Sequence, residues 1–279
     1  MAGHMIYYNL LGLKKYKILT VCFRNKISKD SIILDMHNIK EVKIFLQQVN
    51  PDYIINCIGV LVNAAKKSTK DALYLNAYFP HLLVQLINET NPSTRLIHIS
   101  SDCVFSGIKG SYSDSDIKDA LDVYGMTKNL GEINDNKNIT IRTSIIGPEL
   151  KRNGEGLFHW IFSQKEKKVI NGYEKSIWSG VTTLELSKAI SKCIEHNITG
   201  LYHLSNGEKI SKYMLIKSII DNYSLNISVK KVEGVVSDKS IFPTLIEGFN
   251  YLVPSYDIMI KELYQYMSNN KNLYHFYLG

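Results

Sequence analysis

The sequence contains few of the residues that mark disulfide-rich, metal-binding or membrane proteins. Its four cysteines form no CxxC pair, which argues against a disulfide scaffold or a cysteine-ligated zinc site and favours a reducing cytoplasm. Its eight histidines form no HxH or HxxxH pair, so we expect no metal site. No apolar run approaches the ~18 residues that a membrane-spanning helix requires. The chain of 279 residues therefore has the composition of an ordinary globular protein with no membrane partner.

Arginine is also scarce, although the net charge is +7. Only four of the 33 basic residues are arginine, and the lysines are scattered among acidic residues. Surfaces that recognise nucleic acids usually rely on the fork of donors that arginine provides. The excess positive charge therefore indicates a lysine-rich surface, and we expect no nucleic-acid partner.

The first half of the chain alternates between short apolar runs and segments with helical spacing. Strands are predicted at 17–23, 53–58 and 95–99, and helices at 38–49 and 71–86. Continuous apolar strands separated by helices are typical of a parallel sheet that is covered on both faces. This pattern predicts an α/β protein with a Rossmann-like, doubly wound sheet.

The pattern changes after Gly147, where the segments become shorter and more varied. We expect a dinucleotide-binding domain over residues 1–147 and, mostly, a smaller substrate-binding lobe over 148–279. A strand is predicted at 200–204, and some segments of this second half are expected to return to the sheet. The aromatic tail 274–278 has three open interpretations, namely packing on its own core, contact with a second copy in a homodimer, and fraying.

The strongest chemical signal is the pair Tyr124 and Lys128. Four residues apart on a helix, these side chains share one face, and a nearby ammonium lowers the pKa of a phenol toward the range of a general acid. Tyr and Lys are abundant here, so the pair taken alone is more typical of a solvated helix face than of a catalytic site. Ser101 follows the strand at 95–99, where catalytic side chains gather in such folds, although a turn or capping serine is the alternative.

Other predicted strands end in residues that suit a dinucleotide. Gly59 follows the strand at 53–58 and lets a cofactor approach the backbone, unless it is a plain turn glycine. Arg24 and Asn25 follow the strand at 17–23, and Asp35 follows another short strand. An arginine in this place favours the 2′-phosphate of NADP(H) over NAD(H), with a solvated strand-end arginine as the alternative.

Taken together, these segments resemble the extended short-chain dehydrogenase/reductase superfamily, and within it the nucleotide-sugar reductases of the dTDP-4-dehydrorhamnose reductase type. The resemblance runs in order over most of the chain. It is carried by the segments INCIG (55–59), LNAYFP (75–80), ISSDCVFSG (99–107), VYGMTK (123–128), IRTS (141–144) and GLYHLS (200–205).

The resemblance implies roles for individual residues. Ser101 would hold the substrate carbonyl, Tyr124 would be the acid, and Lys128 would bind the nicotinamide ribose and lower the pKa of Tyr124. The residues expected at the cofactor are Gly3, Arg24, Asn25, Asp35, Met36, Cys57, Ile58, Gly59 and Asn76. The residues expected at the substrate are Ser106, Ser144, Gly180 and Thr182.

The implied activity is the NADPH-dependent reduction of the C4 keto group of a 4-keto-6-deoxy sugar linked to dTDP or UDP, for deoxysugar or surface polysaccharide synthesis in the cytoplasm. Two alternatives remain open. One is an epimerase or dehydratase that keeps NAD bound, and the other is a non-catalytic binding subunit on the same fold.

The beginning of the chain departs from the family pattern. The family starts with a strand and a GxxGxxG turn, whereas here only Gly3 resembles the end of that turn. We therefore expect roughly ten residues to be absent, which is the length of a short strand and a turn. A misplaced start, an incomplete sequence and a damaged product are all open explanations. In each case we expect two unpaired strand edges and weak NADPH binding.

Overall fold

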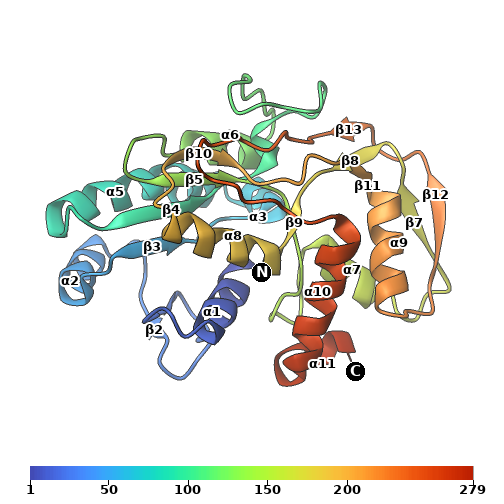
Figure 1. Ribbon diagram of the computed structural model, residues 1–279, viewed down its shortest axis with the longest axis horizontal. Helices are drawn as coiled ribbons and strands as arrows, with labels where there is room; N and C mark the ends of the chain where they lie inside the picture. Colours follow the sequence, from blue (N-terminus) through green and yellow to red (C-terminus); the bar gives the residue numbers. More distant parts are fainter. Residues whose placement is uncertain (279) are drawn as a thin grey trace.

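The computed structural model describes residues 1–278 and shows an α/β protein built from several parallel sheets and flanking helices (Figure 1). Its helices are α1 (Ala2–Gly12), α2 (Ile39–Val49), α3 (Val62–Lys67), α4 (Thr69–Ala72), the π-helix η1 (Leu73–Tyr78), α5 (Phe79–Thr90), the 3₁₀ helix η2 (Asp102–Val104), α6 (Val123–Leu130), α7 (Leu157–Ser163), α8 (Thr183–Glu195), α9 (Lys212–Asn222), α10 (Tyr256–Asn269) and α11 (Lys271–Leu278). Its strands are β1 (Val21–Cys22), β2 (Ile32–Ile33), β3 (Tyr53–Asn56), β4 (Arg95–Ile99), β5 (Ile139–Arg142), β6 (Ile145–Ile146), β7 (Val169–Tyr173), β8 (Ser176–Trp178), β9 (Val181–Thr182), β10 (Gly200–His203), β11 (Ile210–Ser211), β12 (Ser228–Val232) and β13 (Ser237–Asp238).

The largest sheet contains four parallel strands in the order β10-β5-β4-β3. β10 comes from the second half of the chain and pairs with β5 from Gly200 opposite Ile139 to His203 opposite Arg142. The parallel Rossmann-like fold predicted from the apolar strands is therefore confirmed, and β10 is a segment of the second half that lies in the main sheet.

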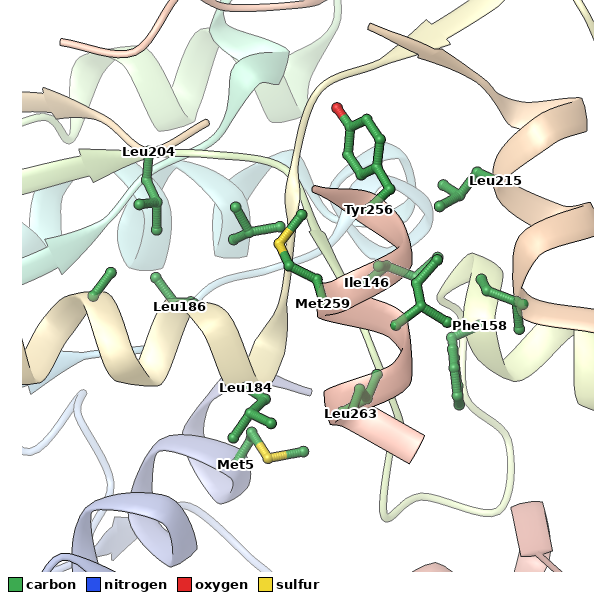
Figure 2. Packing of buried hydrophobic residues seen from close by; sticks show 14 of the residues in the cluster. Met5, Ile146, Phe158, Leu184, Leu186, Leu204, Leu215, Tyr256, Met259 and Leu263 are labelled. Atoms are coloured by element: carbon green, nitrogen blue, oxygen red, sulfur yellow. The ribbon is translucent and has the colours of Figure 1, made fainter. Parts of the chain in front are cut away.

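Both faces of this sheet are covered. In β4, Leu96 belongs to a core formed with α2 and α5, whereas its neighbour Ile97 belongs to a larger core that includes Met5 of α1 and Leu184 of α8. Successive side chains of a strand point to opposite faces, so an uninterrupted apolar strand needs a hydrophobic layer on each side. In Figure 2, Met5 and Leu184 lie together where α1 meets α8.

The strands β1 and β2 form a separate parallel pair. Within residues 1–278, the only strand partner of β3 is β4, and β1 pairs only with β2. The strand expected over 17–23 is reduced to Val21–Cys22, and the side chains of Val21 and Ile33 are exposed. A strand that pairs with a neighbour on one side alone is shorter, because its backbone groups on the open side have no strand partner.

The second half of the chain builds two further small sheets beside α9, namely β7 with β12 and β8 between β11 and β13. The aromatic tail packs on the protein's own core. Tyr274 and Tyr277 are buried, and the Tyr277 hydroxyl donates a hydrogen bond to the carbonyl of Glu149 at 3.0 Å. No helix within the described part of the chain is both long and apolar enough to cross a bilayer.

The contact between α6 and η1 depends on a glycine. A Cβ atom at Gly131, which ends α6, would collide with the backbone carbonyl oxygen of Asn76 in η1. We expect Gly131→Ala to destabilise the fold by about 1–3 kcal/mol, because the helices must separate to admit the methyl group. Gly12→Ala is the matched control, since a Cβ at Gly12 has open space around it. Urea unfolding measures both, and equal midpoints for the two variants would contradict the expected collision.

Candidate active site

Helix α6 carries Tyr124 and Lys128 to the end of β4. The helix begins at Asp122, whose carboxylate accepts a hydrogen bond from the backbone N–H of Gly125 at 3.0 Å. Gly125 has no side chain, and this lets α6 lie directly against the backbone of Cys103 in η2. The segment after β4, which carries Ser101, and the helix α6, which carries Tyr124 and Lys128, are therefore packed against each other.

Ser101 is buried at the carboxyl end of β4. Its hydroxyl accepts a hydrogen bond from the backbone N–H of Cys103 and donates one to the Asp102 carboxylate, both at 3.0 Å. The Ser144 side chain also hydrogen-bonds the Asp102 carboxyl, whose pKa is raised by burial. Ser101 is thus a capping serine for η2 and at the same time forms a buried pair with Asp102, with the half-buried Ser144 beside them.

Two opposed influences act on the pKa of the Tyr124 phenol. Burial is the larger influence and raises the pKa of Tyr124, while a hydrogen bond with Ser101 lowers it. The sequence predicts instead that the charge of Lys128 dominates and lowers this pKa. The difference arises because the phenol lies beside Cys103 and Asp102, so an anion there would be poorly solvated and repelled. Tyr124 therefore keeps its proton at neutral pH.

The ammonium group of Lys128 is also buried. Its Nζ donates a hydrogen bond to the carbonyl of Ile99 at 2.7 Å and lies 3.4 Å from Nε2 of His98. Burial lowers the pKa of Lys128 to about 8, against the opposing influence of Glu132 and Cys57. Lys128 is therefore the member of the pair that changes charge near neutral pH.

Two buried polar groups near the site were not found from the sequence. Within β3 and β4, Asn56 and His98 face each other, with Asn56 Nδ2 3.2 Å from His98 Nδ1. The sequence feature that could have revealed them is a polar residue within an otherwise apolar strand.

The second group is an ion pair between Arg142 and Glu132, in which Arg142 Nε and one terminal nitrogen donate to the two carboxylate oxygens at 2.7 and 2.6 Å. Ser100 donates to the same carboxylate at 2.7 Å, and the other terminal nitrogen of Arg142 lies 3.0 Å from His203 Nε2.

Asn76 fastens the loop after β3 to α6. Its Oδ1 accepts from the backbone N–H of Val60 at 2.8 Å, and its Nδ2 donates to the Val60 carbonyl at 3.0 Å and to Thr127 Oγ1 at 3.2 Å. Gly59 precedes this loop position, where a Cβ atom would lie 3.4 Å from Asn76 Oδ1. The predicted cofactor residues Gly59 and Asn76 therefore lie next to each other.

The other residues predicted at the loop after β3 lie nearby. The backbone N–H of Ile58 donates to Asn56 Oδ1 at 3.1 Å, and Cys57 is exposed. A Cβ atom at Gly3, in the first turn of α1, would lie 3.7 Å from the Cβ of Cys57. The start of α1 and this loop therefore form one edge of the site.

The residues predicted after β1 and β2 form a second group. Arg24 and Asn25 are exposed, and the Arg24 guanidinium lies over the ring of Phe23. Hydrogen bonds from His37 lower the pKa of Asp35, and the charge of Arg24 acts in the same direction. The carbonyl of Met36 accepts a hydrogen bond from the Tyr74 hydroxyl at 2.9 Å.

The four residues predicted to bind the substrate make different contacts within the protein. Ser106 donates to Asp119 at 2.6 Å. A Cβ atom at Gly180 would collide with the Ser144 carbonyl, and the Thr182 hydroxyl caps α8 by accepting from the Glu185 N–H at 3.1 Å. The structure joins Ser144 to Ser101 through Asp102 and gives Gly180 and Thr182 packing and capping contacts, so their contact with substrate stays a prediction.

The family relationship follows from comparison with known proteins. Residues 9–244 match the sequence model of a family described as the RmlD substrate binding domain. The chain belongs to the RmlD substrate-binding domain family. This result confirms the resemblance to dTDP-4-dehydrorhamnose reductases within the extended superfamily.

Individual relatives of this RmlD-family chain are distant. It is 25% identical to a hypothetical dTDP-4-dehydrorhamnose reductase from Sulfolobus tokodaii, with a TM-score of 0.76 and coverage of 91% of this chain and 95% of the other. A dTDP-4-dehydrorhamnose reductase from Bacillus anthracis, solved in complex with NADP, is 24% identical, with a TM-score of 0.72 and coverage of 84% and 87%. Methionine adenosyltransferase 2 subunit beta of Xenopus tropicalis is 24% identical over 209 residues, which span 69% of this chain but only 60% of that protein.

Proposed function

We propose that the chain is an NADPH-dependent reductase of a 4-keto-6-deoxy nucleotide sugar. The observation that carries the proposal is the convergence of Ser101, Tyr124 and Lys128 at the carboxyl end of β4. When bound, the nicotinamide supplies a hydride to the C4 carbonyl carbon. Tyr124 donates its proton to the carbonyl oxygen, Ser101 orients that oxygen, and the substrate leaves as the C4 alcohol.

The residues at the strand ends suit NADP(H). Arg24 offers an exposed guanidinium beside the end of β1, and Asp35 lies close enough for this charge to act on its carboxyl. A guanidinium forms bidentate hydrogen bonds to phosphate, which distinguishes a 2′-phosphate from a 2′-hydroxyl. The NADP complex of the Bacillus anthracis protein supports the same choice.

The direct test is NADPH oxidation with a panel of 4-keto-6-deoxy sugars linked to dTDP or UDP, followed spectrophotometrically. We expect turnover with at least one member, and slower turnover when NADH replaces NADPH. Absence of turnover across the panel, with NADPH binding demonstrated by calorimetry, would overturn the reductase proposal.

The pH dependence provides a further prediction. The pKa of Lys128 is lowered to about 8, so the ammonium form is lost as the pH rises through that value. If the ammonium supports the reaction, kcat/KM falls by about tenfold per pH unit above this pKa. Measurement of kcat/KM at about ten pH values between ~6 and ~10 tests this decrease. A profile that stays flat up to pH 10 would contradict a role for the Lys128 charge.

A second candidate function is a non-catalytic subunit. It is favoured by the relative from Xenopus tropicalis, which is named as a subunit of methionine adenosyltransferase 2. This candidate predicts NADP(H) binding without turnover of any sugar in the panel. An epimerase or dehydratase would instead retain NAD through purification, which extraction and chromatography of the bound nucleotide would detect.

A further inference from the structure

A row of three buried polar side chains runs from the main sheet to α6. Asn56 in β3, His98 in β4 and Lys128 in α6 are each less than 5% exposed. Asn56 Nδ2 lies 3.2 Å from His98 Nδ1, and His98 Nε2 lies 3.4 Å from Lys128 Nζ. His98 therefore contacts an amide on one side and the lysine on the other.

The hydrogen-bond network assigns the tautomer of His98. The backbone N–H of Ile58 donates to Asn56 Oδ1 at 3.1 Å, which fixes the amide so that its NH₂ group faces the imidazole. His98 Nδ1 must then accept a hydrogen bond, and a neutral imidazole that accepts at Nδ1 carries its proton on Nε2. Burial and the charge of Lys128 hold the pKa of His98 well below its usual range, so the ring is neutral.

This tautomer presents an N–H to Lys128. An ammonium group has three donors and no acceptor, so it gains nothing from a second donor 3.4 Å away. The uncharged amine has a lone pair that accepts from His98 Nε2–H while the amine still donates to the Ile99 carbonyl. The contact therefore favours the amine over the ammonium.

We propose that Asn56 and His98 form a positioning pair that sets the protonation state of Lys128. The pair acts through the direction of one hydrogen bond, the one between His98 Nε2 and Lys128 Nζ. This inference rests on the proposed reductase function for its role in turnover, although the protonation state itself is measurable without activity.

Several neighbouring elements carry titratable groups. α3 and α4 pack against α6 and carry the exposed residues Lys66, Lys67, Lys70 and Asp71. The charge of His81 on α5 lowers the pKa of His98. Glu132 follows α6 and Cys57 follows β3, and both favour the charged lysine. η1 faces the helix with the neutral Asn76, and η2 carries Asp102 and Cys103, which act on Tyr124. His98 is thus the neighbour whose hydrogen bond opposes Glu132, and the balance allows a lysine that both gives and takes a proton at neutral pH.

The tautomer is tested first in the unchanged protein. Long-range ¹H–¹⁵N NMR correlations on protein labelled with ¹⁵N-histidine distinguish Nε2–H from Nδ1–H, and His98→Gln identifies the signal by its loss. We expect the Nε2–H tautomer of a neutral ring at pH 7. An Nδ1–H tautomer or a charged ring would overturn the proposal.

The effect on Lys128 is tested by titrating protein labelled with ¹³Cε-lysine, with the Lys128 resonance assigned from its loss in Lys128→Met. A glutamine at position 98 offers Lys128 a carbonyl oxygen, so we expect His98→Gln to move this titration upward by about one pH unit. In Asn56→Asp the new carboxylate accepts a hydrogen bond from Nδ1–H, which reverses the tautomer, and we expect the titration to shift in the same direction.

His159→Gln is the control, because His159 is buried against Tyr277 in the second half of the chain, away from this row. We expect no change in the Lys128 titration in this variant. An unchanged titration in both His98→Gln and Asn56→Asp would overturn the inference. Failure of the reductase proposal alone would leave the tautomer and the titration as expected while no sugar is reduced.

Discussion

Tyr124→Phe is expected to lower kcat by about 10²–10⁴-fold, which is the usual contribution of a positioned general acid. The substitution removes only the hydroxyl, so the ring still packs beside Cys103 and the site keeps its shape. Burial raises the pKa of Tyr124, so the phenol carries its proton at neutral pH. NADPH oxidation in the presence of the best sugar of the panel measures kcat, and calorimetry measures NADPH binding.

The matched control for this experiment is Tyr78→Phe. Tyr78 lies on η1, and its side chain is exposed, so loss of its hydroxyl should leave kcat within about twofold. Retained activity in Tyr124→Phe would remove this residue from the acid role. Loss of NADPH binding together with kcat would indicate instead that the phenol is needed to maintain the cofactor site.

Arg142→Met is expected to destabilise the folded protein by about 3–5 kcal/mol, since removing one partner of a buried ion pair leaves the other charge uncompensated. Arg142 is fully buried, and its methionine replacement has a similar length but no donors. The Glu132 carboxylate would then retain one hydrogen bond, from Ser100. Urea unfolding at pH 7 measures the loss.

An exposed ion pair provides the comparison. Lys109 contacts Asp116 at 2.6 Å on the surface, and Lys109→Met should cost no more than about 1 kcal/mol. The double variant Arg142→Met with Glu132→Leu should recover part of the loss, because no unpaired charge remains. A loss below about 1 kcal/mol in Arg142→Met would show that water reaches Glu132.

The fold was predictable where local pattern and long-range packing agree. β4 has the predicted bounds 95–99, and α2 begins one residue after the predicted 38, because Asn38 caps the helix through its side chain. The strand at 17–23 was overestimated, since apolar content alone does not report whether a neighbouring strand is present to complete the ladder.

The candidate site was predictable at the level of motifs and less so at the level of charge. Spacing brought Tyr124 and Lys128 to one helix, but it carried no information on burial, which reverses the expected direction of the tyrosine pKa. His98 and Arg142 were missed as site neighbours because their partners come from elsewhere in the chain: Asn56 lies on β3, and Glu132 follows α6. Such pairs become visible only when the strand order is known.

The pairing of β10 with β5 has a consequence for synthesis of the chain. The sheet is not complete until Gly200–His203 has been made, and α1 has no covering layer until α8, at Thr183–Glu195, is available. A nascent chain of 147 residues thus leaves Met5 and Ile141 exposed to solvent although both are core residues of the finished protein. The first half therefore leaves the ribosome before the helix and the strand that cover these side chains have been made, and exposed apolar surface of this kind promotes aggregation.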